Sequence, residues 1–346
     1  MLSHSHIVFL SALTSFAITY FAIPKIISFA KRFRLADSAG SRASHQGSVP
    51  VFGGVGIFAG FIFSLLFWSD MPNLQFILAS ITIIFLAGII DDLLSLTPYK
   101  KIIIQVISIL LLIYGADVRI ESMHGVLGIY ELPYIISALF TIFVIVVIIN
   151  CVNLIDGVDG LAGGIGSIAC IGFGVVAYMM SQYDIAVFSF SLSGALLAFL
   201  KYNFYPAKIF MGDTGSLLIG LALSVLAINS IKMGFIFDTY TLPNKGPLIA
   251  IVFLAVPLFD SLRVFIARVS KGRHPLHPAR DHIHHALLKL GFGHKYTSIA
   301  LYHIAISFIL CAYFLLSLNI NLGIAILAGI VFLVLLVPFY LADRKK

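Results

Sequence analysis

Two adjacent carboxylates, Asp91 and Asp92, end the apolar run 83–90 and are the first candidates for catalysis along the chain. Adjacent acids repel each other, so they need a neighbouring cation or must share a proton. Lys100 and Lys101 follow after a short loop and could supply the positive charge, as could a bound divalent ion. An ordinary charged loop end is the competing interpretation. The pair alone favours a functional site only slightly, because two adjacent aspartates are a common dipeptide.

A denser polar group, the segment 150–160, interrupts one of the most apolar parts of the chain. Asp156 and Asp159 are three residues apart, so on helical geometry their side chains face the same way. Oxygen-rich side chains suit a hard cation such as Mg²⁺, or the hydroxyl and imide groups of a nucleotide. A plain polar turn would not need so many polar groups. We therefore expect this segment, with Asn153, Asp156 and Asp159, to be functional and not a plain polar turn.

The segment 201–216 leads directly into another apolar run and presents Asp213 between glycines. Thr214 and Ser216 are good helix-capping residues, and a helix N-terminus attracts anions such as phosphate. Capping alone explains Thr214 and Ser216, but it explains Asp213 less well, because the flanking glycines suggest a carboxylate presented to a ligand. The segment lacks the P-loop consensus, so it is not a P-loop.

The segment 268–296 is strongly basic and holds six of the eleven histidines, among them His282, His284 and His285. Closely spaced histidines can bind zinc, so a zinc site is one interpretation. No cysteine lies in this segment, and Arg273 disfavours a cation. Imidazole and basic donors together favour an anion such as a diphosphate.

The composition predicts a polytopic membrane protein. Of 346 residues, 60% are hydrophobic and only 11% are charged, and the mean hydropathy is +1.06. A soluble domain carries about 25% charged residues, so these values exclude a soluble enzyme, a disordered protein and a nucleic-acid binder. The three cysteines lie far apart in apolar stretches, which favours small buried side chains over a disulfide framework.

Eleven apolar runs are candidates for membrane spans of about 20 residues. They cover residues 7–29, 52–68, 74–90, 102–118, 134–152, 161–180, 185–200, 216–231, 247–267, 297–317 and 320–341. The sequence thus predicts an all-α bundle of ten or eleven transmembrane helices in a single domain, 1–346. The first run has no basic segment before it and is too long for a signal peptide, so we expect it to be retained.

Basic residues predict the orientation of this bundle. Seventeen Lys and Arg residues fall on one side of the expected spans, and only Arg119, Lys232 and Lys245 fall on the other. The positive-inside rule therefore places the N-terminus in the periplasm and the C-terminus in the cytoplasm. The candidate acids lie on the same basic side, so we expect an active site on the cytosolic face, formed by loops near 31–51, 91–101, 153–160, 201–215 and 268–296.

In chain order, Asp91-Asp92, the 150–160 segment, the Met-Gly-Asp-Thr-Gly-Ser sequence at 211–216 and the His-Ile-His-His sequence at 282–285 resemble a known set of motifs. They are similar to those of the polyprenyl-phosphate N-acetylhexosamine-1-phosphate transferases, the superfamily that contains MraY, WecA and TagO. The resemblance extends over residues 24–300. The His-Gln-Gly sequence at 45–47, the form of the histidine motif and eleven expected spans look closest to the WecA-like branch.

The resemblance implies a reaction and its participants. A UDP-activated amino sugar, most simply UDP-N-acetylglucosamine, and undecaprenyl phosphate would give undecaprenyl-diphosphate-sugar and UMP, with Mg²⁺ or Mn²⁺ as cofactor. This is the first membrane step of cell-envelope polysaccharide synthesis, such as that of O-antigen and lipopolysaccharide, in the bacterial inner membrane. A homodimer is compatible with this expectation, and no nucleic-acid partner is expected.

The resemblance also implies roles for individual residues. Asp213 matches the principal Mg²⁺ ligand, and Asp92 is expected as a second ligand. Asp91, Asp92 and Asp156 match catalytic positions. The expected substrate-binding residues are Asn153, Asp159, Lys101, Asn203, His45, His282, His284 and His285. Where the family often has a basic residue, this chain has Ala43, so a phosphate contact at that position is not carried over.

Several alternatives remain open at this point. The lipid phosphate could attack the sugar nucleotide directly, or a carboxylate could act first as nucleophile in a two-step route. The sugar could instead be a 6-deoxyhexosamine or a muramyl-pentapeptide. A secondary transporter is a weaker alternative, because its ionisable groups would lie at mid-membrane in paired halves. A zinc hydrolase is also weaker, because no HExxH motif is present.

Overall fold

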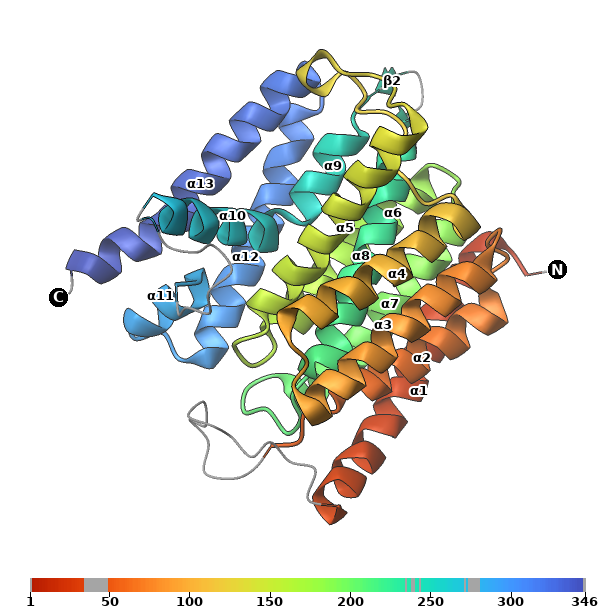
Figure 1. The fold of residues 1–346 in the computed structure, drawn as a ribbon, viewed down its shortest axis with the longest axis vertical. Helices are drawn as coiled ribbons and strands as arrows, with labels where there is room; N and C mark the ends of the chain where they lie inside the picture. The colour runs from red at the N-terminus through yellow and green to blue at the C-terminus, as the bar shows by residue number, and fades with distance from the viewer. Residues whose placement is uncertain are drawn as a thin grey trace.

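The computed structural model describes residues 2–33, 49–233, 235–237, 240–242, 244–270, 272 and 281–344, which are almost entirely helical (Figure 1). The long helices are α1 (His4–Arg32), α2 (Gly53–Trp68), α3 (Leu74–Leu94), α4 (Pro98–Ala116), α5 (Tyr134–Ile155), α6 (Leu161–Met179), α7 (Tyr183–Asn203), α8 (Gly212–Lys232), α9 (Gly246–Phe253), α10 (Ala255–Val269), α12 (His294–Leu315) and α13 (Ile320–Arg344). Shorter elements are η1 (Val126–Gly128), α11 (Ile283–Lys289) and an antiparallel hairpin of β1 (Phe235–Phe237) and β2 (Tyr240–Leu242). The predicted all-α polytopic fold is confirmed.

Helix α8 forms the centre of the bundle. It packs against α2, α3, α5, α6 and α9, and most of its residues are buried. Small residues allow this close packing: a Cβ added to Gly220 would lie 2.6 Å from the Cα of Ile149 in α5. With 21 residues, α8 is about 31 Å long, close to the thickness of a bilayer core. Its first turn is therefore held rigidly at one end of the bundle.

Consecutive helices run in alternating directions, so the bundle has two distinct ends. At one, which we call the site end, α3 and α5 end and α4 and α8 begin. At the other, which we call the far end, α4 ends and α5, α9 and α13 begin. All the candidate acids named above lie at the site end. The assignment of that end to the cytosol stays a prediction.

Among the described residues, nine helices are long and apolar enough to cross a bilayer, and a tenth span results if α9 and α10 are counted together. Helix α2 is apolar but has only 16 residues. The expected span over 247–267 corresponds to α9 and α10, which are bent by 78° relative to each other (Figure 1).

Two features of the sequence account for this bend. Pro257 has no N–H to donate to the carbonyl of Phe253, four residues earlier, and α9 ends at that residue. Helix α10 then carries Asp260, Arg263 and Arg268 among its apolar residues, which makes it amphipathic. An amphipathic helix is more stable beside the bundle than across a bilayer core.

Candidate active site

Glycines bring two helices against the first turn of α8. A Cβ on Gly88 of α3 would lie 2.4 Å from the Cα of Thr214, and one on Gly54 of α2 would lie 2.3 Å from the amide nitrogen of Gly215. Real Cβ atoms essentially never come closer than 3.0 Å to such neighbours. Because α3 approaches so closely, the acids at its C-terminal end reach the start of α8.

Asp92 caps the N-terminus of α8 from this neighbouring helix. Its Oδ1 accepts a hydrogen bond from the backbone N–H of Asp213 at 2.8 Å. Its Oδ2 accepts from the N–H of Thr214 at 3.0 Å and from the Thr214 hydroxyl at 2.5 Å. The first N–H groups of a helix lack intrahelical partners and carry its positive dipole end, so a carboxylate stabilises them. Asp92 therefore fixes the position of Asp213, while its catalytic and metal-binding roles stay predictions.

Lys101 joins two of the acids into one charged group. Its Nζ lies 2.5 Å from Oδ2 of Asp91 and 2.6 Å from Oδ2 of Asp213. The Asn153 amide donates to Oδ1 of Asp213 at 3.1 Å, so α5 also contributes. We call Asp91, Asp92, Lys101, Asn153 and Asp213 the acidic centre. The structure thus brings together residues that the sequence separates by more than a hundred positions.

The acidic centre fits a Mg²⁺ ion that is shared with a bound diphosphate. Among the described residues, no three His, Cys, Asp or Glu side chains are grouped so that they could hold a metal alone. Mg²⁺ is usually bound by one or two carboxylates together with substrate phosphates and water. Asp213 and Asp91 provide two carboxylates, and the Lys101 ammonium balances only one of their two negative charges. The requirement for Mg²⁺ itself stays a prediction.

Asp156 follows the last residue of α5 and accepts no hydrogen bond on its side chain from any residue in the described part of the chain. Burial, and to a lesser extent the negative charges of Asp213, Asp92 and Asp159, together raise the pKa of this carboxyl group to about 7. A group with a pKa near neutrality can accept or donate a proton at physiological pH. This property supports the predicted catalytic role of Asp156.

We expect Asp156→Asn to make the protein more resistant to heat at high pH. The pKa of about 7 in the folded state exceeds the usual value of an unfolded aspartate, about 3.9. Ionisation of Asp156 therefore destabilises the fold increasingly as the pH rises from about 4 to 7, whereas an amide does not ionise. In metal-free buffer, the melting temperature of the variant should exceed that of the wild type by more at pH 8 than at pH 5. An equal difference at both pH values would contradict this account.

Asp159 and Asn203 hold neighbouring loops together behind the acidic centre. Both are almost fully buried. Asp159 accepts a hydrogen bond from the N–H of Ala207 at 3.0 Å. Asn203 accepts one from the N–H of Gly160 at 2.9 Å and donates to the carbonyl of Ile209 at 2.8 Å. These bonds show a structural role for both residues, and their predicted contact with substrate stays a prediction.

The histidine motif is anchored by an acid that the sequence analysis did not single out. Asp260 of α10 is fully buried, and its Oδ2 lies 2.8 Å from Nδ1 of His282. Its Oδ1 accepts a hydrogen bond from the N–H of Ile283 at 2.9 Å, so Asp260 holds the start of α11. Arg263, one turn further along α10, donates to the carbonyl of Asp281. The sequence did contain a signal for Asp260, because it is an acid inside the expected span 247–267. Acids within membrane spans usually have a function.

His284 connects this motif to the turn that holds Asp156. A Cβ added to Gly157 would lie 2.6 Å from Nε2 of His284, so the histidine ring packs directly on this glycine. Burial lowers the pKa of His284 to about 3, and the neighbouring His285 acts in the same direction. The imidazole of His284 is therefore neutral at pH 7. It could bind a ligand through an N–H group but not through a positive charge.

Replacing Gly157 by alanine should displace His284 and reduce transfer activity by at least about tenfold. Overpacking a tight contact costs about 1–3 kcal/mol, and here the contact links two parts of the site. Gly293→Ala is a matched control at the same end of the bundle, since a Cβ there would meet no atom within 4 Å. Activity and melting temperature should be measured for both variants. If Gly157→Ala had wild-type activity, the contact between Gly157 and His284 would not be required for transfer.

His45 lies within residues 34–48, outside the part of the chain that the structure describes. Its predicted binding role therefore stays a prediction. The structure places His282, His284 and His285 together on α11 and its N-cap, with ring centroids of His284 and His285 4.2 Å apart. Their contact with substrate is likewise a prediction.

Comparison with known proteins identifies the family. Residues 74–231 match Glycosyl transferase family 4. A Pasteurella multocida protein named undecaprenyl-phosphate alpha-N-acetylglucosaminyl 1-phosphate transferase is 34% identical, over 82% of this chain and 79% of the relative. A probable undecaprenyl-phosphate N-acetylglucosaminyl 1-phosphate transferase of Bacillus subtilis is 30% identical, over 88% and 84%.

A third relative extends this similarity to another lipid carrier. The decaprenyl-phosphate N-acetylglucosaminephosphotransferase of Mycolicibacterium smegmatis is 32% identical, over 85% of this chain and 78% of the relative. These relatives are similar to this chain over most of their length. In the structure, the motifs at the ends of α3, α5 and α8 meet at one end of the bundle. The chain belongs to the polyprenyl-phosphate N-acetylhexosamine-1-phosphate transferases of Glycosyl transferase family 4, on their WecA-like branch.

Proposed function

We propose that this protein transfers N-acetylglucosamine 1-phosphate from UDP-N-acetylglucosamine to undecaprenyl phosphate. The products are undecaprenyl-diphosphate-N-acetylglucosamine and UMP. The observation that carries the proposal is the acidic centre, in which Asp91, Lys101 and Asp213 form one charged group at the ends of three helices. A lipid phosphate at the membrane surface can meet a soluble nucleotide sugar only at such an end. The names of the relatives support the choice of lipid and sugar.

The reaction exchanges one diphosphate bond for another. An oxygen of the lipid phosphate forms a bond to the β-phosphorus of the sugar nucleotide. The bond between the β-phosphorus and the oxygen that bridges to the α-phosphorus breaks, and this oxygen leaves with its electron pair as part of UMP. Because one diphosphate linkage replaces another, no ATP is required. The main barrier is the approach of one anion to another, which positive charge and accurate positioning lower.

The residues of the acidic centre divide this work. Lys101 supplies positive charge, and Asp213 would hold Mg²⁺. Asp91 is proposed as the second ligand in place of the expected Asp92, because both oxygens of Asp92 accept hydrogen bonds from the first turn of α8. When bound, Mg²⁺ neutralises phosphate charge during the transfer. Asp92 keeps Asp213 in place through the first turn of α8. Asp156, whose pKa is about 7, would accept the proton of a lipid phosphate that arrives protonated.

The proposed reaction takes place at the cytosolic face of the bacterial inner membrane. The distribution of basic residues supports this orientation, since seventeen Lys and Arg residues lie on the side of the candidate acids and three on the other. Nucleotide sugars are made in the cytosol, so an active site on this face has access to its donor.

Purified protein in detergent, with undecaprenyl phosphate, Mg²⁺ and a panel of UDP-sugars, tests the proposal by the rate of UMP release. We expect the fastest release with UDP-N-acetylglucosamine and none without the lipid. The panel should include a UDP-6-deoxyhexosamine and UDP-muramyl-pentapeptide. Faster release with either of these would assign another sugar. If labelled UMP were incorporated into the sugar nucleotide in the absence of lipid, the reaction would follow a two-step route and not direct attack by the lipid phosphate.

A further inference from the structure

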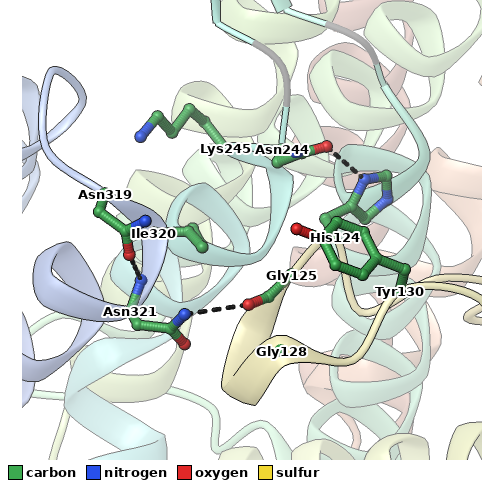
Figure 2. Close-up of a pocket in the computed structure, with 9 residues that line it drawn as sticks. All are labelled: His124, Gly125, Gly128, Tyr130, Asn244, Lys245, Asn319, Ile320 and Asn321. Atoms are coloured by element: carbon green, nitrogen blue, oxygen red, sulfur yellow. Dashed lines mark hydrogen bonds between the residues drawn. The ribbon is translucent and has the colours of Figure 1, made fainter.

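A polar pocket of about 290 Å³ lies at the far end of the bundle (Figure 2). The loop between α4 and α5, the residues just before α9 and the start of α13 line it. Helix α4 separates this pocket from the acidic centre, since Lys101 lies in its first turn and its 19 residues span about 28 Å. The pocket is therefore not part of the site proposed above.

In two asparagines of the pocket, Asn319 and Asn321, the side-chain oxygen accepts a hydrogen bond from a backbone N–H group. Oδ1 of Asn321 accepts a hydrogen bond from the N–H of Leu127 at 2.7 Å, and its Nδ2 donates to the carbonyl of Gly125 at 3.0 Å. Oδ1 of Asn319 accepts from the N–H of Asn321 at 2.9 Å, as Figure 2 shows. Because backbone groups fix these orientations, the amide NH₂ of Asn319 is left as a donor.

A third asparagine repeats this arrangement. Oδ1 of Asn244 lies 3.3 Å from Nδ1 of His124, so the ring N–H donates to the amide oxygen (Figure 2). The NH₂ group of Asn244, a residue that lines the pocket, is then also left as a donor. Both remaining amide groups of the pocket thus present N–H groups instead of oxygens.

Lys245 adds a positive charge to these donors. The residue is only 9% exposed, and its ammonium donates to the carbonyl of Leu318. No Asp or Glu lines the pocket, and Lys245 has no ion pair with any residue that the structure describes. Burial lowers the pKa of Lys245 below its usual range, because the ammonium loses water without gaining a counter-charge.

We propose that this far-end pocket is an anion-binding site that takes one phosphate group. Two amide donors and a nearly buried lysine, with no competing carboxylate in the lining, form a set that recognises an anion. Its volume lies at the small end of the range that is typical of ligand pockets, about 300–1,000 Å³, and leaves room for a phosphate group. The phosphate can be inorganic or belong to a phospholipid headgroup of the adjacent leaflet. A bound phosphate would connect three segments of the chain and so stabilise the fold.

The test uses the full-length protein and a variant that changes only the donor character of the pocket. Asn319→Asp keeps an oxygen for the N–H of Asn321 and replaces the NH₂ donor by a negatively charged oxygen. Asn244→Asp makes the same exchange on the other wall. Asn73→Asp is the matched control, since it adds the same charge to an exposed residue at the far end, outside the pocket.

Melting temperatures should be measured without Mg²⁺, in detergent with increasing inorganic phosphate at constant ionic strength, and in nanodiscs of phosphatidylglycerol or phosphatidylcholine. We expect phosphate to raise the melting temperature of the wild type and of Asn73→Asp. In Asn319→Asp and Asn244→Asp, we expect the phosphate concentration for half the shift to rise at least about tenfold. UMP release at the site end should be unchanged in these two variants.

The outcomes also identify the source of the phosphate. Stabilisation by inorganic phosphate in detergent assigns a soluble anion, and stabilisation by phosphatidylglycerol alone assigns a lipid headgroup. Either result supports the site, provided that Asn319→Asp weakens the stabilisation and Asn73→Asp does not. No stabilisation of the wild type under any condition, or the same response in Asn319→Asp as in Asn73→Asp, would overturn the proposal.

Discussion

Replacing Asp213 by asparagine is expected to reduce UMP release by at least about 1,000-fold, which corresponds to about 4 kcal/mol in the barrier. The carboxylate lies at the start of α8, in contact with Lys101 and Asn153. An amide of the same size cannot bind Mg²⁺ through a negative charge, and it also removes the partner that orients Lys101. Asp92 can still cap the helix, because its bond goes to the backbone N–H of residue 213. The variant should therefore fold.

Asp70→Asn is the control for this substitution. Asp70 is exposed and lies between α2 and α3, at the far end, so its loss removes one negative charge without touching the acidic centre. Its activity and melting temperature should match those of the wild type. If Asp213→Asn retained more than a tenth of the wild-type activity, Asp213 could not be the ligand that we assign.

Replacing Gly88 by alanine is expected to lower activity at least about 100-fold and also to lower the melting temperature. The new Cβ would lie 2.4 Å from the Cα and 2.7 Å from the nitrogen of Thr214. Backbone atoms cannot rotate away as a side chain can, so α3 and α8 would have to separate. Overpacking of this kind costs about 1–3 kcal/mol, and a displacement of about 1 Å at an active site can lower a rate about 100-fold.

Gly329→Ala tests whether the effect comes from the contact. Gly329 also lies within a helix, α13, but a Cβ there would meet no atom within 4 Å. Alanine favours helices over glycine by about 1 kcal/mol, so this variant should be at least as stable as the wild type. Equal behaviour of the two variants would show that the approach of α3 to α8 does not position the acids.

The helices and the main acids were predictable because their signals are local. Apolar runs mark the helices, and Asp91, Asp156 and Asp213 stand out as acids at the ends of such runs. A charged residue beside a bilayer core is energetically costly, so it usually has a function. Its position at the end of an apolar run can be recognised from the sequence alone. The gathering of these acids at the site end follows from the alternation of the helices.

Contacts between distant segments were not predictable. Asp260 and His282 are 22 positions apart, and their contact depends on the bend between α9 and α10. The two oxygens of Asp92 bind the first turn of α8, which is about 120 positions away. Sequence spacing carries no information on either contact, because each depends on how complete helices pack.

Binding of UDP-N-acetylglucosamine, measured by calorimetry on the purified protein with and without Mg²⁺, tests most directly whether the acidic centre holds the ion and the donor together. We predict that removal of Mg²⁺ weakens binding to the wild type at least about tenfold, and that Asp213→Asn binds weakly under both conditions. If Asp213→Asn bound the nucleotide sugar as tightly as the wild type, with the same dependence on Mg²⁺, the acidic centre would not be the place where they meet.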